Sequence, residues 1–224
     1  MKPFDVGRMV AFDLETTGTD PFTCRIVTSS LVRLTAGQQP KRVAMLADPG
    51  VEIPEAAARV HGITTERARA EGAPHAEVLN RTIAMLQSSW RDGYAVVAYN
   101  AAYDLTVLRS QEPSFTVDGL VVDPYVLDRK LDRWRKGKRT LDATCTHYGV
   151  RLDKAHDSTE DALAAARLAW KMAKEHPELT SMDGDELMEF QAVAAWEQAE
   201  DFRAWLRKQG KDASDVDGSW PMRG

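Results

Sequence analysis

The spacing of hydrophobic and polar positions changes along this chain. In the first part, apolar and β-branched residues form short runs, and these runs predict strands at residues 9–13, 25–34 and 42–47. Turn-like segments rich in Thr, Gly, Asp and Pro separate the runs. We therefore expect a three-strand meander at the start of the fold.

From about residue 54 the pattern becomes mainly helical. Apolar residues at three- and four-residue intervals predict helices over residues 54–60, 65–70, 76–90, 101–110, 125–131, 141–148 and 158–175. Two short apolar runs between them predict buried strands at residues 94–98 and 120–123. The order of elements predicts an α/β fold with a mixed central sheet, formed by the meander plus parallel strands, and helices on its faces.

The C-terminal part differs in composition from the rest. An acidic segment at residues 183–186 predicts the cap of a final helix that ends at Gly210. Residues 211–224 are polar and rich in Pro, Gly and Asp, so we expect this tail to be mobile. We predict a main domain over residues 1–178 and a C-terminal helical extension with a polar tail over residues 179–224.

Composition and charge exclude several classes of protein. Of the 224 residues, 43% are hydrophobic and 28% charged, which excludes a disordered chain. The two cysteines, Cys24 and Cys145, form no CxxC pattern, so we expect a reducing, cytoplasmic location and no cysteine metal site. No apolar run approaches the ~20 residues of a membrane span, and no signal peptide is readable. The net charge of −5 argues against non-specific coating of nucleic acid but leaves room for a local site.

Acidic residues lie where predicted strands end and helices begin. Asp13 and Glu15 end the first strand, and because residues i and i+2 of a strand share a face, their carboxylates would lie side by side. Asp104 falls in the first turn of one helix, and Asp161 in the first turn of another, shortly after His156. Each acid alone has an ordinary explanation: a solvated strand end, a helix dipole or a capping box.

Taken together, these residues indicate a metal centre, because α/β sheets build their sites at such strand ends and helix starts. Four carboxylates with one histidine suit the hard cations Mg²⁺ or Mn²⁺ rather than zinc. Two such ions about 3.5–4 Å apart can hold both the attacking and the leaving oxygen of a phosphoryl displacement. A neutral histidine can accept the proton of the attacking water. The combination predicts metal-assisted phosphodiester hydrolysis.

At these residues the sequence resembles the DnaQ-like exonucleases of the DEDD superfamily, which includes the proofreading epsilon subunit of bacterial DNA polymerase III and RNase T. Four segments carry the resemblance in the family's order: residues 12–18, 61–63, 100–104 and 156–161. His156 indicates the histidine variant (DEDDh), because the tyrosine of the other branch would stand at Asp157. The match extends from about residue 9 to residue 174, most of the chain.

The resemblance implies an RNase H-like fold and 3′→5′ removal of nucleotides as 5′-monophosphates. It implies two divalent metal ions, Mg²⁺ or Mn²⁺, held by Asp13, Glu15, Asp104 and Asp161. It gives His156 the role of general base. It places near the substrate Leu14, Thr16, Thr17, Asn100 and His61.

Two aromatic residues depart from the family pattern. Tyr99 stands where a histidine is common, and Tyr103 where a phenylalanine is usual. Both keep an aromatic-sized side chain, so we expect activity to survive. We expect a change in how the strand end or the substrate is supported.

A basic stretch at residues 129–139 is the candidate for contact with a nucleic-acid backbone. It holds seven cations and one tryptophan in a chain that is acidic overall. Phosphates on Arg133 and Arg135, with a base stacked on Trp134, would suit a single strand. A solvated loop between two helices is the alternative.

We therefore expect a 3′→5′ exonuclease that acts on single-stranded or frayed 3′ ends of DNA. An RNA-trimming enzyme of the same family stays open, because the motifs do not read the 2′-hydroxyl. The other alternative is a catalytically idle module that binds nucleic acid or a polymerase, which the presence of all the motif residues disfavours. The C-terminal extension either covers the core or docks a replicative polymerase or other repair partner, and no membrane partner is expected.

Overall fold

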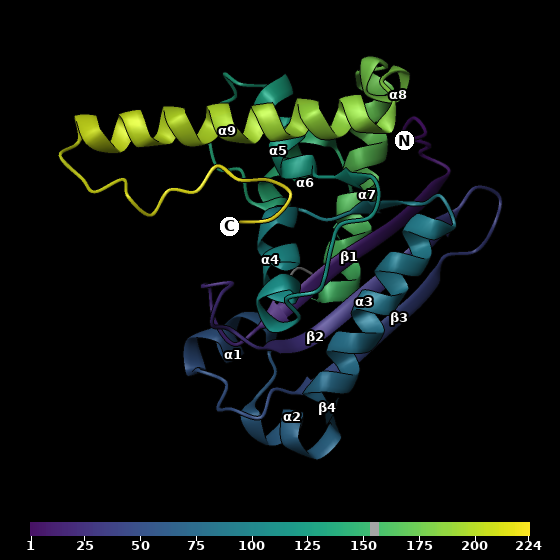
Figure 1. Cartoon of the computed structure of the whole chain (residues 1–224), viewed down its shortest axis with the longest axis vertical. Coiled ribbons are helices and arrows are strands. Elements are labelled where there is room, and N and C mark those ends of the chain that lie inside the picture. Colours follow the sequence, from purple (N-terminus) through teal and green to yellow (C-terminus); the bar gives the residue numbers. More distant parts are fainter. Residues whose placement is uncertain (153–156) are drawn as a thin grey trace.

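The computed structural model describes residues 1–152 and 157–224, and in this part of the chain a six-stranded sheet forms the centre (Figure 1). In chain order the strands are β1 (Arg8–Thr16), β2 (Ile26–Thr35), β3 (Lys41–Asp48), β4 (Ala73–Pro74), β5 (Ala95–Val97) and β6 (Val121–Val122). They lie side by side in the order β4-β3-β2-β1-β5-β6. The first three pair antiparallel, whereas β5 joins β1 and β6 joins β5 in parallel. The predicted meander and parallel strands are confirmed.

Helices cover both faces of the sheet. They are α1 (Glu55–His61), α2 (Thr65–Glu71), α3 (His75–Arg91), α4 (Ala101–Gln111), α5 (Pro124–Leu131), α6 (Leu141–Tyr148), α7 (Ser158–Glu175), α8 (Glu178–Ser181) and α9 (Gly184–Lys208). α3 and α4 share one hydrophobic core with the sheet, whereas α6 and α7 share the other. The short elements β4 and α8 escaped the sequence analysis, because two to four residues are too few to show a period. None of the described helices has the length and apolar character needed to cross a bilayer.

The alternation of side chains along β1 places its two acids on the same face of the sheet. Phe12 and Leu14 belong to the core beneath α3 and α4, whereas Ala11 belongs to the core beneath α7. Because successive side chains of a strand point to opposite faces, Asp13 and Glu15 lie on the Ala11 face. The predicted pairing of the two carboxylates on one face therefore follows from the strand itself.

α9 closes the sheet edge at β6. The N–H of Val121 donates to Met188 Sδ at 3.3 Å, and Gln191 Nε2 donates to the Val121 carbonyl at 2.9 Å. Gln191 Oε1 accepts from the N–H of Asp123 at 2.7 Å. The fully buried Gln191 thus supplies hydrogen bonds that a further strand would have made to this edge.

The sequence predicts the start of α9 correctly and the tail after it incorrectly. Asp183 and Glu186 form the expected capping box at the N-terminus of α9. The tail, expected to be mobile, instead turns back under α9 (Figure 1), and Trp220 is buried in the core at 9% exposure. One aromatic anchor docks the segment without changing its polar composition, so composition alone could not reveal the contact.

Candidate active site

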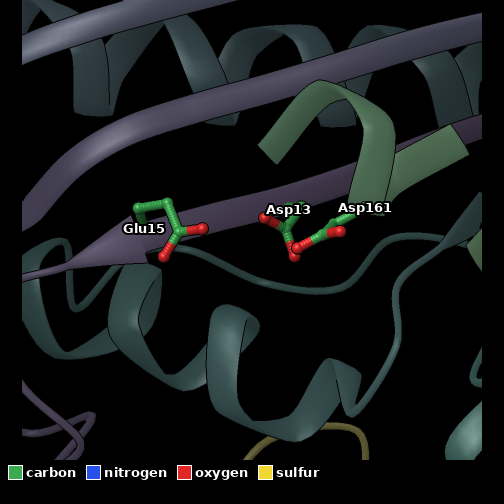
Figure 2. A group of neighbouring side chains, drawn as sticks. All are labelled: Asp13, Glu15 and Asp161. Atoms are coloured by element: carbon green, nitrogen blue, oxygen red, sulfur yellow. The ribbon is translucent and has the colours of Figure 1, made fainter. Parts of the chain in front are cut away.

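Three of the four predicted acids meet where β1 ends and α7 begins (Figure 2). One carboxylate oxygen from each of Asp13, Glu15 and Asp161 lies within 4.8 Å of the others. All three residues are partly exposed, so an ion can reach them from solvent. The register of β1 against β2 shifts between Glu15 and Thr16, an irregularity that bends a strand locally. Carboxylate oxygens at this separation suit Mg²⁺ or Mn²⁺, so the residues present fit the implied metal.

Asp104 joins this group from the first turn of α4. It is buried, and its Oδ1 accepts a hydrogen bond from the N–H of Leu14 at 3.1 Å. Leu14 stands between the two acids of β1, and the charge of Asp104 acts directly on Asp13. The structure therefore brings Asp104 beside the other three acids, but Asp104 is not part of the group whose oxygens lie within 4.8 Å of one another.

Burial and mutual repulsion raise the pKa values of these acids. Burial is the largest cause at Asp13, where the neighbouring acids raise the pKa further, well above its usual range. Burial, followed by repulsion from Asp161 and Asp157, raises the pKa of Glu15 to about 7. Burial raises the pKa of Asp104 to about 8 against the opposing effect of its backbone hydrogen bonds. Among the described residues, no lysine or arginine forms an ion pair with Asp13, Glu15 or Asp104.

Hydroxyl groups fix the start of α7 against β2. Ser158 Oγ lies 2.7 Å from Ser30 Oγ and accepts from Thr28 Oγ1 at 3.2 Å. Asp157 caps the helix by accepting from the N–H of Thr159 at 3.1 Å. These contacts hold the turn that carries the last acid of the site. Two serines in the middle of an otherwise apolar strand were the signal for these contacts in the sequence.

Both aromatic departures from the family pattern use their hydroxyl groups. Tyr103 Oη lies 2.6 Å from Thr16 Oγ1 and ties α4 to the end of β1. Tyr99 Oη donates to the carbonyl of Arg139 at 2.8 Å, which ties β5 to the loop before α6. A phenylalanine at position 103, usual in the family, has no hydroxyl group and could not make the bond to Thr16. The altered support predicted for the strand end is thus a pair of hydroxyl contacts.

Asp123, which the sequence analysis did not select, organises the start of α4. Its carboxylate accepts from the N–H groups of Asn100 and Ala101, each at 2.9 Å, and from that of Tyr125 at 3.0 Å. Asn100 has a left-handed backbone (φ 65°, ψ 46°), and its side chain makes no capping bond within the described residues. Asn100 thus occupies the N-cap position, but Asp123 provides the side-chain acceptor. An aspartate directly after an apolar run was the available signal, as at Asp13.

The His-Gly-Ile segment lines a groove beside Glu15. The groove has a volume of about 610 Å³, and Arg59 and Arg67 line it together with His61 and Ile63. His61 Nδ1 accepts from the N–H of Ile63 at 3.2 Å, and burial lowers the pKa of His61. The ring is therefore neutral at neutral pH, with its proton on Nε2.

Three of the remaining residues expected at the site lie in the described part of the chain, and one does not. Leu14, Thr16 and Thr17 are buried at the end of β1 and in the turn that follows. His156, the expected general base, lies outside the described residues, and its role stays a prediction. Its neighbour Asp157 stands at the start of α7.

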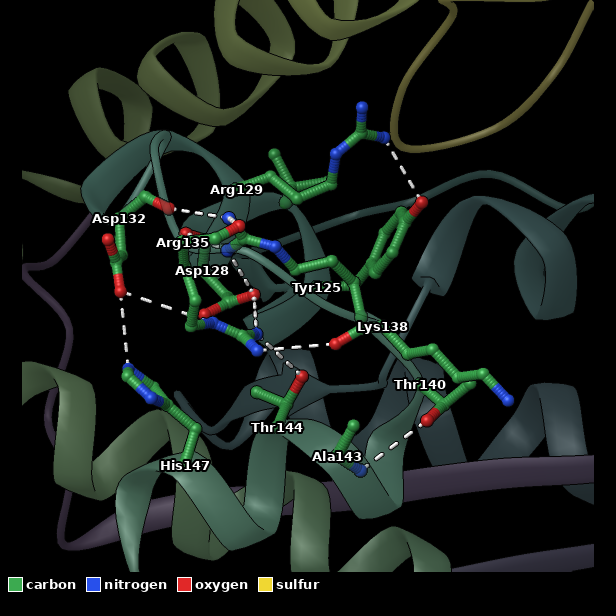
Figure 3. Close-up of polar contacts among 12 residues, drawn as sticks. Tyr125, Asp128, Arg129, Asp132, Arg135, Lys138, Thr140, Ala143, Thr144 and His147 are labelled. Atoms are coloured by element: carbon green, nitrogen blue, oxygen red, sulfur yellow. Dashed lines mark hydrogen bonds and ion pairs between the residues drawn. The ribbon is translucent and has the colours of Figure 1, made fainter.

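The basic stretch folds around a buried carboxylate (Figure 3). Asp128 is fully buried, and its Oδ2 accepts from Arg135 at 2.6 Å and from Arg139 at 2.7 Å. Only 9% of the Arg135 side chain is exposed. These two arginines hold the loop together.

Other residues of the basic stretch face outward. Arg133 pairs with Asp201 of α9 at 2.7 Å, with more than half of both side chains exposed. Trp134 is 84% exposed, and the Arg133 guanidinium lies 5.3 Å from its ring centre. The predicted contact with nucleic acid therefore rests on Arg133 and Trp134 more than on Arg135.

Comparison with known proteins identifies relatives among DNA polymerase components. The family model RNase_T, described as an exonuclease, matches residues 10–169. A PolC-type DNA polymerase III of Halalkalibacterium halodurans is 29% identical over 185 residues, which cover 80% of this chain and 12% of that protein. A DNA polymerase III subunit epsilon-like protein of Rhodobacter capsulatus is 32% identical over 174 residues, which cover 73% of this chain and 23% of that protein. This chain thus spans less than a quarter of either relative.

Solved structures share the fold. Exonuclease I from Methylocaldum szegediense matches with a TM-score of 0.62 and 22% identity over 78% of this chain and 42% of that one. Exonuclease X in complex with 5′-overhanging duplex DNA matches with a TM-score of 0.59 and 19% identity over 82% of this chain and 99% of that one. The expected RNase H-like fold is confirmed. Together with the family match over residues 10–169, this shows that the chain belongs to the DnaQ-like exonuclease family.

Proposed function

We propose that this chain is a metal-dependent 3′→5′ exonuclease that releases nucleoside 5′-monophosphates from the 3′ ends of DNA. The observation that carries the proposal is the approach of Asp13, Glu15 and Asp161 to within 4.8 Å, with Asp104 bonded to the backbone between the first two. Acids that repel one another in this way are stabilised by a divalent cation. Structures of similar fold include an E. coli exonuclease I complex with single-stranded DNA, which supports DNA as the substrate.

In this proposal each residue of the site has a defined role. The four acids hold two divalent ions, Mg²⁺ or Mn²⁺, which when bound would offset negative charge on the attacking and leaving oxygens. His156 accepts a proton from the attacking water, whose oxygen forms a bond to phosphorus. The bond from phosphorus to the 3′ oxygen of the preceding nucleotide breaks, and that oxygen takes up a proton. The products are a nucleoside 5′-monophosphate and a shortened strand with a free 3′-hydroxyl.

The substrate end would lie along the groove beside Glu15. His61 lines this groove, and we assign to the terminal nucleotide the same positions that the sequence indicates: Leu14, Thr16, Thr17, Asn100 and His61. Arg133 and Trp134 are assigned to a more distant part of the strand. Because the relatives are DNA polymerase III proteins, a polymerase or another repair partner is the proposed docking partner for the exposed aromatic residues of α9.

Digestion of 5′-labelled substrates tests the proposal. Single-stranded DNA, mismatched duplex and RNA of one sequence are incubated with Mg²⁺, Mn²⁺ or EDTA. We expect metal-dependent shortening from the 3′ end, faster on DNA than on RNA. Faster digestion of RNA would favour the RNA-trimming alternative, and intact substrates under all conditions would favour the idle module.

The role of His156 is tested in the same assay. Loss of the general base in His156→Ala should lower turnover by about 10²–10⁴-fold while leaving the KM for DNA little changed. His176→Ala, at a surface histidine beside Glu178, is the matched control and should keep wild-type turnover. Equal turnover of the two variants would remove His156 from the mechanism.

A further inference from the structure

The C-terminal tail contacts the residue that sets the start of α4. Trp220 Nε1 donates to Asp123 Oδ2 at 3.3 Å, and the indole is 9% exposed. The same Asp123 carboxylate accepts the N–H groups of Asn100 and Ala101. The tail thus adds a fourth donor to a fully buried acceptor that already holds the first residues of the helix.

This acceptor holds a backbone conformation that is costly for a residue with a side chain. Among the described residues, Asn100 is the one non-glycine residue with a positive φ. Such conformations persist only where surrounding contacts impose them. Asp104 follows one turn later in α4, where its carboxylate accepts from the N–H of Leu14 and its charge acts on Asp13. A change in the turn at Asn100 therefore moves an acid of the site.

A second contact of the tail falls just beyond Asp104. The backbone N–H of Arg223 donates to Thr106 Oγ1 at 2.8 Å, and Thr106 is 1% exposed in α4. The tail therefore acts on both sides of Asp104 along the chain. Through Asp123 it acts on Asn100 and Ala101, which precede Asp104, and it contacts Thr106, which follows Asp104.

The path of the tail along α9 depends on a close approach of the two segments. A Cβ placed on Gly218 would lie 2.9 Å from the Cβ of Ala199 and 3.3 Å from the Cα of Trp196. A side chain at residue 218 must therefore push the tail away from α9. Arg203 of α9 also donates to the carbonyl of Val216, which fixes the tail shortly before this point.

We propose that the C-terminal tail is an intramolecular strap that positions Asp104 in the active site, with Trp220 as a positioning residue. The strap lies outside the residues of the family match, 10–169, and so belongs to what this chain adds to the family's catalytic domain. The inference rests on the proposed function for the meaning of the site, but its contacts with Asp123 and Thr106 can be tested without a nuclease assay.

Three variants of the full chain test the strap. Trp220→Phe keeps a ring in the core and removes the indole N–H, whereas Trp220→Ala removes both. Gly218→Leu displaces the tail without changing any residue that bonds to Asp123. Trp205→Ala is the matched control, because this α9 tryptophan is 49% exposed and stacks on Phe202. Lys211 at the start of the tail lies over its ring, but the Trp205 side chain makes no described hydrogen bond to Asp123 or Thr106.

Two readouts are measured on each folded variant: the half-saturating Mn²⁺ concentration by calorimetry and the hydrogen exchange of the Asn100 and Ala101 amides. We expect faster exchange of both amides and a half-saturating concentration about tenfold or more higher in Trp220→Ala and Gly218→Leu. Trp220→Phe should show a smaller shift in the same direction. Turnover on DNA should fall with Mn²⁺ affinity, and the KM for DNA should stay unchanged.

A strap that only adds global stability would leave the Mn²⁺ affinity of the folded chain unaltered, and that result in Trp220→Ala and Gly218→Leu would overturn the proposal. Shifts of equal size in the control Trp205→Ala, in both Mn²⁺ affinity and amide exchange, would overturn the proposal as well. If the wild-type chain binds Mn²⁺ but cleaves no nucleic acid, the proposed function fails and the strap is still decided by affinity and exchange. If the wild-type chain cleaves DNA and the strap variants match it in both readouts, the strap fails alone.

Discussion

Two groups of carboxylates in this molecule are compensated in opposite ways. Asp128 is fully buried and accepts hydrogen bonds from two arginines, Arg135 and Arg139, within the same loop. Asp13 and Asp104 lie among other acids, and no described lysine or arginine pairs with either of them. The first group is compensated by described arginines, whereas the second gathers negative charge that bound protons or a divalent cation would balance.

Under the proposed function, this difference in compensation separates a structural carboxylate from a metal-binding one. Both kinds occur near the ends of secondary structure, and the sequence marks both as acids beside apolar runs. What differs is the neighbouring charge, because buried charges are stable when paired and costly when alone. Changes at the two groups should therefore have opposite effects on activity and stability.

The largest effect is expected at the uncompensated group. Asp13→Asn should lower exonuclease turnover by more than about 10³-fold, because it would remove one of the proposed metal ligands. The metal-free variant should unfold no more easily than the wild type, since one repelling charge is gone. A nuclease assay measures the effect on turnover, and urea unfolding without metal measures the effect on stability. A destabilised variant with normal turnover would assign Asp13 to structure alone.

The reverse outcome is expected at the compensated group. Asp128→Ala leaves the guanidinium groups of Arg135 and Arg139 without their buried partner, and should lower the free energy of unfolding by about 3–5 kcal/mol. The folded fraction should still bind Mn²⁺ with wild-type affinity. Urea unfolding and calorimetry measure these quantities. Stability equal to that of the wild type would show that the ion pairs do not hold the loop.

Stability of the metal-free chain should depend on pH in the direction set by the raised pKa values. In the folded chain the pKa of Glu15 is about 7 and that of Asp104 about 8, so both acids keep their protons up to about these pH values. In the unfolded chain both acids lose their protons near pH ~4. The folded state therefore holds more protons over this range, and the free energy of unfolding falls as pH rises. Burial lowers the pKa of His75 to about 4, so its opposing effect is confined to pH values below about 6.5.

Thermal unfolding in EDTA between pH 6.5 and 8 isolates the contribution of the acids. The midpoint should fall with rising pH, and Asp104→Asn should flatten the slope. Saturating Mg²⁺ should stabilise the chain most at pH 8, because the ion replaces bound protons. A midpoint that rises with pH over this window would contradict the repulsion among these acids.

The smallest effect is expected at the outward-facing residues of the basic stretch. Replacing Arg133, Lys136 and Lys138 by glutamine should weaken binding of single-stranded DNA and reduce its dependence on salt, because fewer counterions are released. Arg135 stays unchanged, so the ion pair with Asp128 is preserved. Fluorescence anisotropy at several salt concentrations measures the slope. The wild-type slope in this variant would show that these cations do not contact the strand.

The sequence predicts the elements of this fold better than the contacts between them. β1, α4 and α7 follow from local periodicity, and the four acids could be selected because each stands at the end or start of such an element. The partners of Asp128, the position of Asp123 and the docking of Trp220 depend on residues far apart in sequence. No local pattern encodes which distant donor meets a buried carboxylate, so these roles required the structure.

Calorimetric titration with Mn²⁺ measures whether the acids around Asp13 form a metal site. We predict that the wild-type chain binds Mn²⁺ with release of protons, more tightly at pH 8 than at pH 6.5, and that Asp13→Asn abolishes this binding. Asp128→Asn should bind as the wild type does. Equal binding by the wild type and Asp13→Asn, or no binding by the wild type, would contradict the account.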